Sequence, residues 1–333
     1  MKISYLATGI FFLVIGLFAG AKFFSSQTPI PLNTDKGINN LELINPIYGF
    51  DLEIDKSDPK VSLIKQDIEN LLNEKTSHSN YNPIGVYFRD LSYGGATFGI
   101  HSDTFFTPAS LFKLPLMMAY FKKAETNPDF LQKKIVYTAD KNTNSSEHFK
   151  DIEYIKPGQN YTIQELIEHM IINSDNEATL LLMENIDQKT TNQTYFDLGI
   201  VIPENDPNAE FVTVKNYASF FRILYNSTYL NEEFSAKALS ILLQANFSQG
   251  LTKQLPPNTK VAHKFGERSD MDKQVKQLHD CGIIYYPHHP YVLCVMTKGD
   301  DFEQMAQMIQ NISKTVYDGM KKFYSFNKSG VRL

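Results

Sequence analysis

The spacing of apolar residues predicts one helix and two strands in the first third of the chain. Apolar side chains recur every three or four positions from Val61 to Leu72, the period of an amphipathic helix. The segments 84–91 and 96–100 are short and largely apolar. Ser92-Tyr93-Gly94-Gly95 between them is typical of a turn, so the two strands are expected to form a hairpin.

Helical patterns dominate from about residue 124 to residue 249. Thr162-Ile163-Gln164-Glu165 is a capping box, in which two side chains satisfy free N–H groups of a first helical turn, and it predicts a helix to about Ile172. Three more helices are predicted at 176–186, from a cap at Thr213 through Leu224, and at 234–245.

Strand patterns return towards the C-terminus, at 261–266, 282–286 and 291–297, before a helical face from Phe302 to Val316. Strands therefore occupy both ends of the pattern, and helices occupy its middle. This order predicts an α+β fold rather than alternating βαβ units. We expect an antiparallel sheet built from both chain ends and flanked by helices, with an inserted all-helical lobe.

Residues 3–24 form an apolar run that is interrupted by no charge until Lys22. A run of this length can span a bilayer, which predicts an N-terminal membrane anchor over residues 1–24. Ala19-Gly20-Ala21 also resembles a signal-peptide cleavage site, so secretion after cleavage is the alternative. In both cases residues 25–59 are expected to be a linker, and residues 60–326 an extracytoplasmic catalytic domain.

Composition supports a sizeable globular domain without a nucleic-acid partner. The chain has 333 residues, is 42% hydrophobic and carries a net charge of −5. This length is enough for one large domain or two lobes around a substantial core. The mild acidity and the lack of a basic stripe with interleaved aromatic residues give no indication of nucleic-acid binding.

The two cysteines, Cys281 and Cys294, lie on the two arms of a predicted hairpin around Pro287-His288-His289-Pro290. If Tyr286 pairs with Tyr291, the cysteines are only diagonal neighbours. Diagonal positions are usually too far apart for an unstrained bridge. Two buried thiols are therefore expected, although export would permit a disulfide.

Candidate chemistry begins in the strongly apolar stretch that follows Pro108, which predicts a buried helix. Ser110 lies in its first turn and Lys113 one turn later, so the amine is expected to reach the hydroxyl. A buried lysine loses its proton more easily and can activate a serine nucleophile. The same spacing at Ser62 and Lys65 lacks such surroundings, so the context rather than the spacing carries the argument.

A second candidate motif, Asn173-Ser174-Asp175-Asn176, joins two predicted helices. Helix capping by its short polar side chains is the simplest interpretation. The functional alternative is that Ser174 passes a proton to a leaving nitrogen, while Asn176 orients Lys113 and the substrate amide.

A third candidate motif, His263-Lys264-Phe265-Gly266, ends a predicted strand. Lys264 would lower the pKa of neighbouring hydroxyl and amine groups, and Gly266 would let a substrate backbone approach the strand edge. A solvated lysine followed by a turn glycine is the alternative.

Together, Ser110-x-x-Lys113, Ser174-Asp175-Asn176 and Lys264-Phe265-Gly266 resemble the S-x-x-K, S-D-N and K-T-G motifs of class A β-lactamases and penicillin-binding proteins, over about residues 60–325. The resemblance implies that Ser110 is the acylated nucleophile and Lys113 its partner. It also implies that Ser174, Asn176 and Lys264 serve proton transfer and substrate binding. The backbone N–H groups of Ser110 and Glu267 would form the oxyanion hole, and no metal or cofactor is implied.

The third motif departs from the family pattern. Phe265 stands where the family has a hydroxyl residue that helps bind the substrate carboxylate, a role that a phenyl ring cannot perform. Arg268 or Ser269 is the hypothetical replacement.

The family's deacylating glutamate, which is followed four residues later by asparagine, also lacks a clear equivalent. Glu204 and Asn208 have that spacing, which makes Glu204 a speculative deacylation base. Alignment on Ile202-Pro203 instead places Tyr195 and Gly199 at these positions. Without a base, the acyl-enzyme should hydrolyse slowly.

Three functions follow from the resemblance. The first is a serine hydrolase of β-lactamase type that opens β-lactam amides through acyl-Ser110. The second is a D,D-peptidase of the cell wall that acts on peptidoglycan stem peptides. The third is an anchored binding protein of the same fold with weak catalysis, which the phenylalanine at position 265 motivates.

Overall fold

The computed structural model describes residues 40–46, 58–76, 83–92, 95–138, 143–150, 153–203, 209–270 and 275–324. The predicted anchor therefore lies outside the described residues, and so does most of the predicted linker. Within the described ranges, none of the helices is both long enough and apolar enough to cross a membrane.

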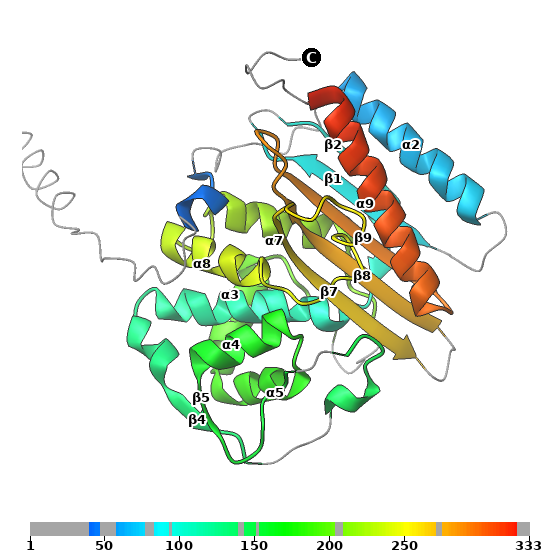
Figure 1. Cartoon of the computed structure of the whole chain (residues 1–333). Helices are drawn as coiled ribbons and strands as arrows, with labels where there is room; N and C mark the ends of the chain where they lie inside the picture. The colour runs from blue at the N-terminus through cyan, green and yellow to red at the C-terminus, as the bar shows by residue number, and fades with distance from the viewer. Residues whose placement is uncertain are drawn as a thin grey trace, which may run out of the picture. The chain divides into compact units, whose positions relative to one another are not determined.

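A five-stranded antiparallel sheet forms the centre of the fold, with the strand order β2-β1-β9-β8-β7 (Figure 1). β1 pairs on one side with β2 in the predicted hairpin and on the other side with β9 along its full length. Strands from the two ends of the chain thus meet in the middle of the sheet, as the sequence predicts. The strands are β1 (Ile84–Asp90), β2 (Thr97–Ile100), β7 (Val261–Asp270), β8 (Val275–Ile284) and β9 (Tyr291–Gly299).

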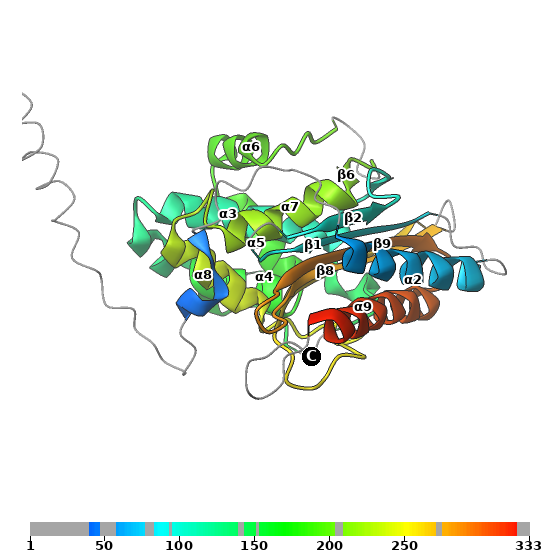
Figure 2. The ribbon, with the colours of Figure 1, turned by 90° about the horizontal axis from the view of Figure 1, so that it is seen from above.

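Helices cover both faces of the sheet and give an α+β fold, which confirms the predicted class. α2 (Pro59–Thr76) and α9 (Phe302–Tyr324) lie side by side on one face (Figures 1 and 2). Ile64 of α2 and Ile309 of α9 are fully buried. The helical lobe and α7 lie on the other side. The remaining α-helices are α3 (Lys113–Ala124), α4 (Ile163–Ile172), α5 (Asn176–Asn185), α6 (Gln188–Asp197), α7 (Val214–Tyr225) and α8 (Glu232–Leu242).

Local capping chemistry explains where several predicted helices begin. Thr162 and Glu165 form the complete capping box at the start of α4. The Thr213 hydroxyl accepts a hydrogen bond from the Asn216 N–H at the start of α7. The polar α6 was not predicted, because its first residues lack an apolar period. The short strand pairs were not predicted either: β3 (Phe105–Phe106) with β6 (Val212–Thr213), and β4 (Lys134–Val136) with β5 (Asn160–Thr162).

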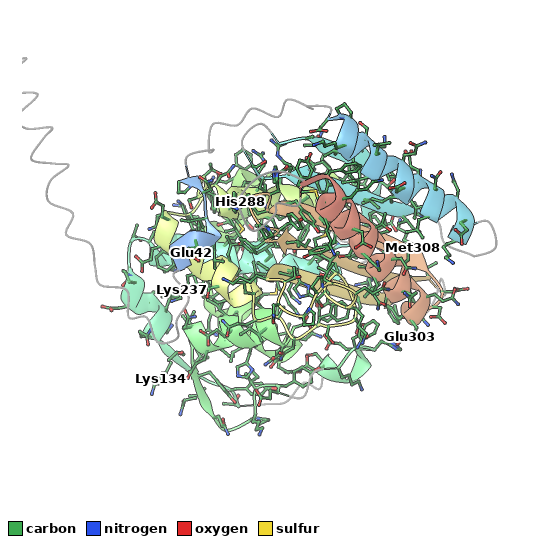
Figure 3. All side chains as sticks on the ribbon, turned by 45° about the horizontal axis from the view of Figure 1, so that its top comes forward. Glu42, Lys134, Lys237, His288, Glu303 and Met308 are labelled. Carbon is green, nitrogen blue, oxygen red and sulfur yellow. A yellow bond between two sulfur atoms is a disulfide. The ribbon has the colours of Figure 1, made fainter. Side chains whose placement is uncertain are left out.

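Part of the predicted linker packs on the domain. Residues Asn40–Leu43 form a short 3₁₀ helix beside α8, and Leu43 is 1% exposed. The Tyr285 hydroxyl donates a hydrogen bond to the Leu43 carbonyl at 3.0 Å. Figure 3 shows side chains filling the space between the elements, whereas Lys134 and Glu303 lie at the periphery.

The expectation of two free thiols is wrong, because Cys281 and Cys294 form a disulfide between β8 and β9. Tyr291 pairs with Ile284 rather than with Tyr286, so the connection is longer than the sequence pattern indicated. This register places the two cysteines directly opposite each other, so that their side chains can meet.

Candidate active site

Ser110 lies in a 3₁₀ turn, Ala109–Phe112, that leads directly into α3. Residues three apart eclipse one another in such a turn, so the Ser110-to-Lys113 spacing keeps both on one side. Ala109 has a φ of 49°, which is uncommon without glycine and marks local backbone strain next to the serine. The Tyr217 hydroxyl, from α7, donates a hydrogen bond to the Leu111 carbonyl at 2.9 Å and so links the turn to α7.

Two β8 side chains that lie outside the three motifs, Gln277 and His279, hold the chain just before this turn. The Gln277 side-chain oxygen accepts a hydrogen bond from the Thr107 N–H at 3.1 Å. His279 Nδ1 accepts from the Thr297 N–H, so its Nε2–H donates to the Thr107 carbonyl at 3.1 Å. Burial lowers the pKa of His279 to about 4 and keeps the ring neutral, as this arrangement requires.

Gly266 permits β7 to approach the serine turn. A Cβ at this position would lie 2.9 Å from the Leu111 nitrogen and 3.0 Å from the Pro108 carbonyl oxygen. The glycine is therefore needed for close packing of β7, the edge strand of the sheet, against the turn. This contact gives the glycine a role other than the predicted approach of a substrate backbone.

The Lys113 amine is buried and directs its hydrogen bonds at the second motif. It donates to the Ser174 carbonyl, to the Ser174 hydroxyl at 3.1 Å and to the Asn176 side-chain oxygen at 2.7 Å. These contacts occupy the donors that were expected to reach Ser110. Burial lowers the pKa of Lys113 to about 8, opposed by the negative charges of Glu147, Asp175 and Glu267.

Ser174 joins the two motif lysines. Its hydroxyl accepts hydrogen bonds from Lys113 Nζ at 3.1 Å and from Lys264 Nζ at 2.9 Å. Ser174 has a φ of 52°, which again indicates backbone strain at a candidate site residue. Asp175 caps α5 through hydrogen bonds from the Glu177 and Ala178 N–H groups, which confirms the capping interpretation, whereas the proton-transfer role of Ser174 stays a prediction.

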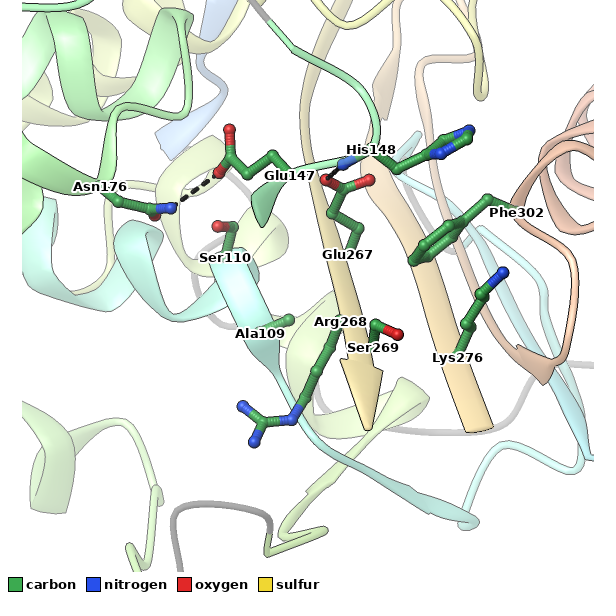
Figure 4. Close-up of a pocket in the computed structure, with 10 residues that line it drawn as sticks. All are labelled: Ala109, Ser110, Glu147, His148, Asn176, Glu267, Arg268, Ser269, Lys276 and Phe302. Carbon is green, nitrogen blue, oxygen red and sulfur yellow. Dashed lines mark hydrogen bonds between the residues drawn. The ribbon is translucent and has the colours of Figure 1, made fainter. Parts of the chain in front are cut away.

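A pocket of about 690 Å³ opens over Ser110 between the turn, α5 and β7 (Figure 4). Ser110, Asn176 and Glu267 line it, whereas Lys113, Ser174 and Lys264 are buried below. The structure thus brings together the residues predicted from the three motifs. We call the buried group of Lys113, Ser174 and Lys264 the floor of the site.

Phe265 does not face this pocket. Its ring is 4% exposed and stacks on Phe247 with the ring centroids 4.0 Å apart. Arg268 and Ser269, the hypothetical substitutes in carboxylate binding, both line the pocket.

Glu147 is a pocket residue that the motifs did not reveal (Figure 4). Its carboxylate accepts hydrogen bonds from Asn176 Nδ2 at 2.9 Å and from the Tyr154 hydroxyl at 3.2 Å. Burial raises its pKa above the ordinary value; Lys113 opposes this shift and Glu267 adds to it. The only sequence signal was an acidic residue in a polar stretch, which is too common to be informative.

The Glu267 side chain closes the pocket wall next to Glu147. Its carboxylate accepts hydrogen bonds from the backbone N–H groups of His148, at 2.6 Å, and Phe149. We call Glu147, His148 and Glu267 the wall of the site. Glu204 lies outside the described residues, so its role as a base stays a prediction. Within the described ranges, no cluster of three or more His, Cys, Asp or Glu side chains is arranged to hold a metal ion.

The fold and the three motifs at this site place the chain in the superfamily of β-lactamases and penicillin-binding proteins. The model of the β-lactamase enzyme family matches residues 63–320, and the chain therefore belongs to that family. A comparison with curated proteins gives no significant match.

Solved structures show the same fold at low sequence identity. A mutant of PBP-A, in an acyl-enzyme complex with penicillin G, is 23% identical, with 80% of this chain and 100% of that chain covered and a TM-score of 0.65. A β-lactamase from Chitinophaga pinensis is 19% identical, with 77% and 98% covered and a TM-score of 0.65. A class A β-lactamase representative from Bacteroides cellulosilyticus is 19% identical, with 80% and 100% covered and a TM-score of 0.64.

Proposed function

We propose that the protein is a serine hydrolase of β-lactamase type, which opens β-lactam amide bonds through an acyl-Ser110 intermediate. The observation that carries this proposal is the pocket over Ser110, below which Lys113 and Lys264 both donate hydrogen bonds to the Ser174 hydroxyl. This arrangement combines an accessible nucleophile with buried groups that can exchange its proton.

In the acylation step, Ser110 Oγ attacks the amide carbonyl carbon while Lys113 takes the hydroxyl proton. The backbone N–H groups of Ser110 and Glu267 stabilise the negative charge that develops on the carbonyl oxygen. The C–N bond then breaks, and the Ser174 hydroxyl gives its proton to the leaving nitrogen. Ser174 recovers a proton from Lys113, to which it is hydrogen-bonded at 3.1 Å.

The substrate carboxylate is expected to bind at Arg268 and Ser269. Both line the pocket on β7, one and two residues beyond Glu267. A guanidinium group offers two parallel donors to a carboxylate, which compensates for the hydroxyl that Phe265 lacks.

A D,D-peptidase acting on peptidoglycan stem peptides is the second candidate. The observation that favours it is that none of the described residues between α6 and α7 lines the pocket. A site without a base there would acylate readily and deacylate slowly. A weakly catalytic binding protein is the third candidate, and an unreactive Ser110 would support it.

We also propose that the protein is exported and held at the membrane by residues 1–24, or secreted if these are cleaved. The apolar run in the sequence supports this proposal. A protease added to intact cells should then degrade the catalytic domain, and a domain protected until the cells are lysed would contradict export.

The decisive test of the catalytic proposal exposes the full chain to a fluorescent penicillin and locates the adduct by mass spectrometry. We expect an adduct on Ser110 that is absent in Ser110→Ala. Ser62→Ala is a matched control, because Ser62 begins the same Ser-x-x-Lys spacing on the exposed side of α2. Product release would support the β-lactamase, a lasting adduct the peptidase, and no Ser110-dependent adduct would reject both.

A further inference from the structure

The Glu147 carboxylate is positioned in the pocket together with the proposed nucleophile. In Figure 4 it extends from its loop towards Asn176, on the same side of the pocket as the Ser110 hydroxyl. Asn176 donates to Glu147 at 2.9 Å and accepts from Lys113 at 2.7 Å, so one amide group links the carboxylate to the lysine. Glu147 is also the strongest negative charge acting on Lys113.

The segment that carries Glu147 is fixed on both sides of this residue. Before it, Asn144 donates to the Asp175 carboxylate at 3.0 Å and accepts from the Asn176 N–H at 2.8 Å. After it, the N–H groups of His148 and Phe149 donate to Glu267. A side chain held between two such contacts is oriented in advance, as a catalytic group must be.

The other carboxylate that lines the pocket has a different task. Glu267 accepts hydrogen bonds from two backbone N–H groups, so its oxygens are committed to holding the loop. Glu147 accepts from side chains, Asn176 and Tyr154, and lies nearer to the Lys113 network. Among the described pocket residues, Glu147 is therefore the carboxylate best placed to receive a proton from water.

We propose that Glu147 is the general base that activates the water molecule that hydrolyses acyl-Ser110. This inference rests on the proposed acyl-enzyme function. Glu147 takes one proton from water as the water oxygen bonds to the acyl carbonyl carbon. Glu147 passes this proton to Lys113 through water in the pocket, and Lys113 gives it to Ser110 Oγ as the bond between the acyl carbon and Oγ breaks. Asn176 positions the base.

The surroundings of Glu147 suit a base at neutral pH. The charged groups that act on Glu147 are Lys113 from α3 and Lys264 and Glu267 from β7, and the Tyr154 hydroxyl from the following loop donates a hydrogen bond to it. Burial outweighs the two lysines and raises the pKa of Glu147. A carboxylate whose pKa lies closer to neutrality takes up a proton from water more readily.

The test measures acylation and deacylation separately in the full chain. A fluorescent penicillin labels Ser110, excess reagent is removed, and mass spectrometry follows the loss of the adduct. In Glu147→Gln we expect deacylation to fall at least about 100-fold and acylation to fall less than about 10-fold. Glu147→Asp should keep part of the deacylation rate, and Glu233→Gln, an exposed change on α8, should match the native chain.

The pH profile provides a second readout. Deacylation by the native chain should fall as Glu147 becomes protonated at acidic pH, whereas Glu147→Gln should lack this dependence. An adduct that leaves Glu147→Gln at the native rate, or that never leaves the native protein, would overturn the role of Glu147. Equal losses of the acylation rate and the deacylation rate in Glu147→Gln would also overturn the role of Glu147. A native chain without any Ser110 adduct would instead refute the proposed function.

Discussion

The floor and the wall of the pocket are built in different ways. Lys113, Ser174 and Lys264 are at most 4% exposed, and both lysines donate hydrogen bonds to the Ser174 hydroxyl. The two lysines come from α3 and β7, and Ser174 comes from the short connection between α4 and α5. Glu147, His148 and Glu267 lie at the solvent side, and two of the three come from a loop. Rigid elements position groups more precisely than loops do. We infer that the floor sets whether Ser110 is acylated, and that the wall acts mainly on the later hydrolysis of the acyl-enzyme.

The largest effect is expected from Lys113→Met. Loss of the general base should lower the acylation rate by about 1,000-fold, because the Ser110 hydroxyl is a poor nucleophile until a base takes its proton. Fluorescent-penicillin kinetics would measure this loss, with Lys123→Met, an ion-pair partner of Asp187 on the same helix, as the control.

The pH dependence of acylation checks the same assignment. Lys113 must be neutral to accept a proton, and burial lowers its pKa to about 8. Acylation by the native chain should therefore rise with pH up to about 8 and level off above it. A native profile that falls over this interval would contradict Lys113 as the base.

A large effect on stability, rather than chemistry, is expected from Asp175→Ala. The Asp175 carboxylate is fully buried and accepts hydrogen bonds from the Glu177, Ala178 and Ile155 N–H groups. Its removal leaves these buried donors unsatisfied and should lower the free energy of unfolding by about 3 kcal/mol. Denaturant unfolding would measure the loss.

Asp187→Ala is the matched control for that change. Asp187 also caps a helix, α6, but it is solvent-exposed, so water can replace its contacts. Its substitution should destabilise the protein clearly less. Equal losses of the free energy of unfolding in the two variants would show that burial of the Asp175 cap adds nothing to its contribution to stability.

The contrast between the floor and the wall explains how much of the molecule could be predicted from sequence. Each floor residue lies in a short sequence motif. Lys113, for example, follows Ser110 by three residues, so the sequence predicts these two residues together. Apolar periods likewise predict β1, β9 and α9. The wall depends on long-range contacts, such as Glu267 with His148, which no local pattern encodes. The disulfide was not predicted for a related reason. The β8–β9 register differs by two residues from the expected one, and only the observed register places Cys281 opposite Cys294.

A smaller effect on acylation is expected from Gly266→Ala. The added Cβ would press on the Leu111 nitrogen and the Pro108 oxygen and displace the turn that carries Ser110. We expect acylation to fall about 100-fold, the scale of a misplacement near 1 Å. Gly199→Ala is the control: its φ of 69° makes the change unfavourable, but its Cβ meets no neighbouring atom, so stability should fall without a loss of acylation.

The smallest effect is expected from Glu267→Gln, which tests whether the wall has only a small influence on acylation. The amide keeps one oxygen for the His148 N–H and leaves the backbone of β7 in place, so acylation should change less than about 10-fold. Glu267 is one of the negative charges that raise the pKa of Lys113, so its neutralisation should shift the pH midpoint of acylation downwards. Acylation rates measured from pH 6 to 10 would show the shift. A loss as large as that of Lys113→Met would mean that Glu267 belongs with the floor, and that loop contacts determine reactivity as strongly as the buried amines do.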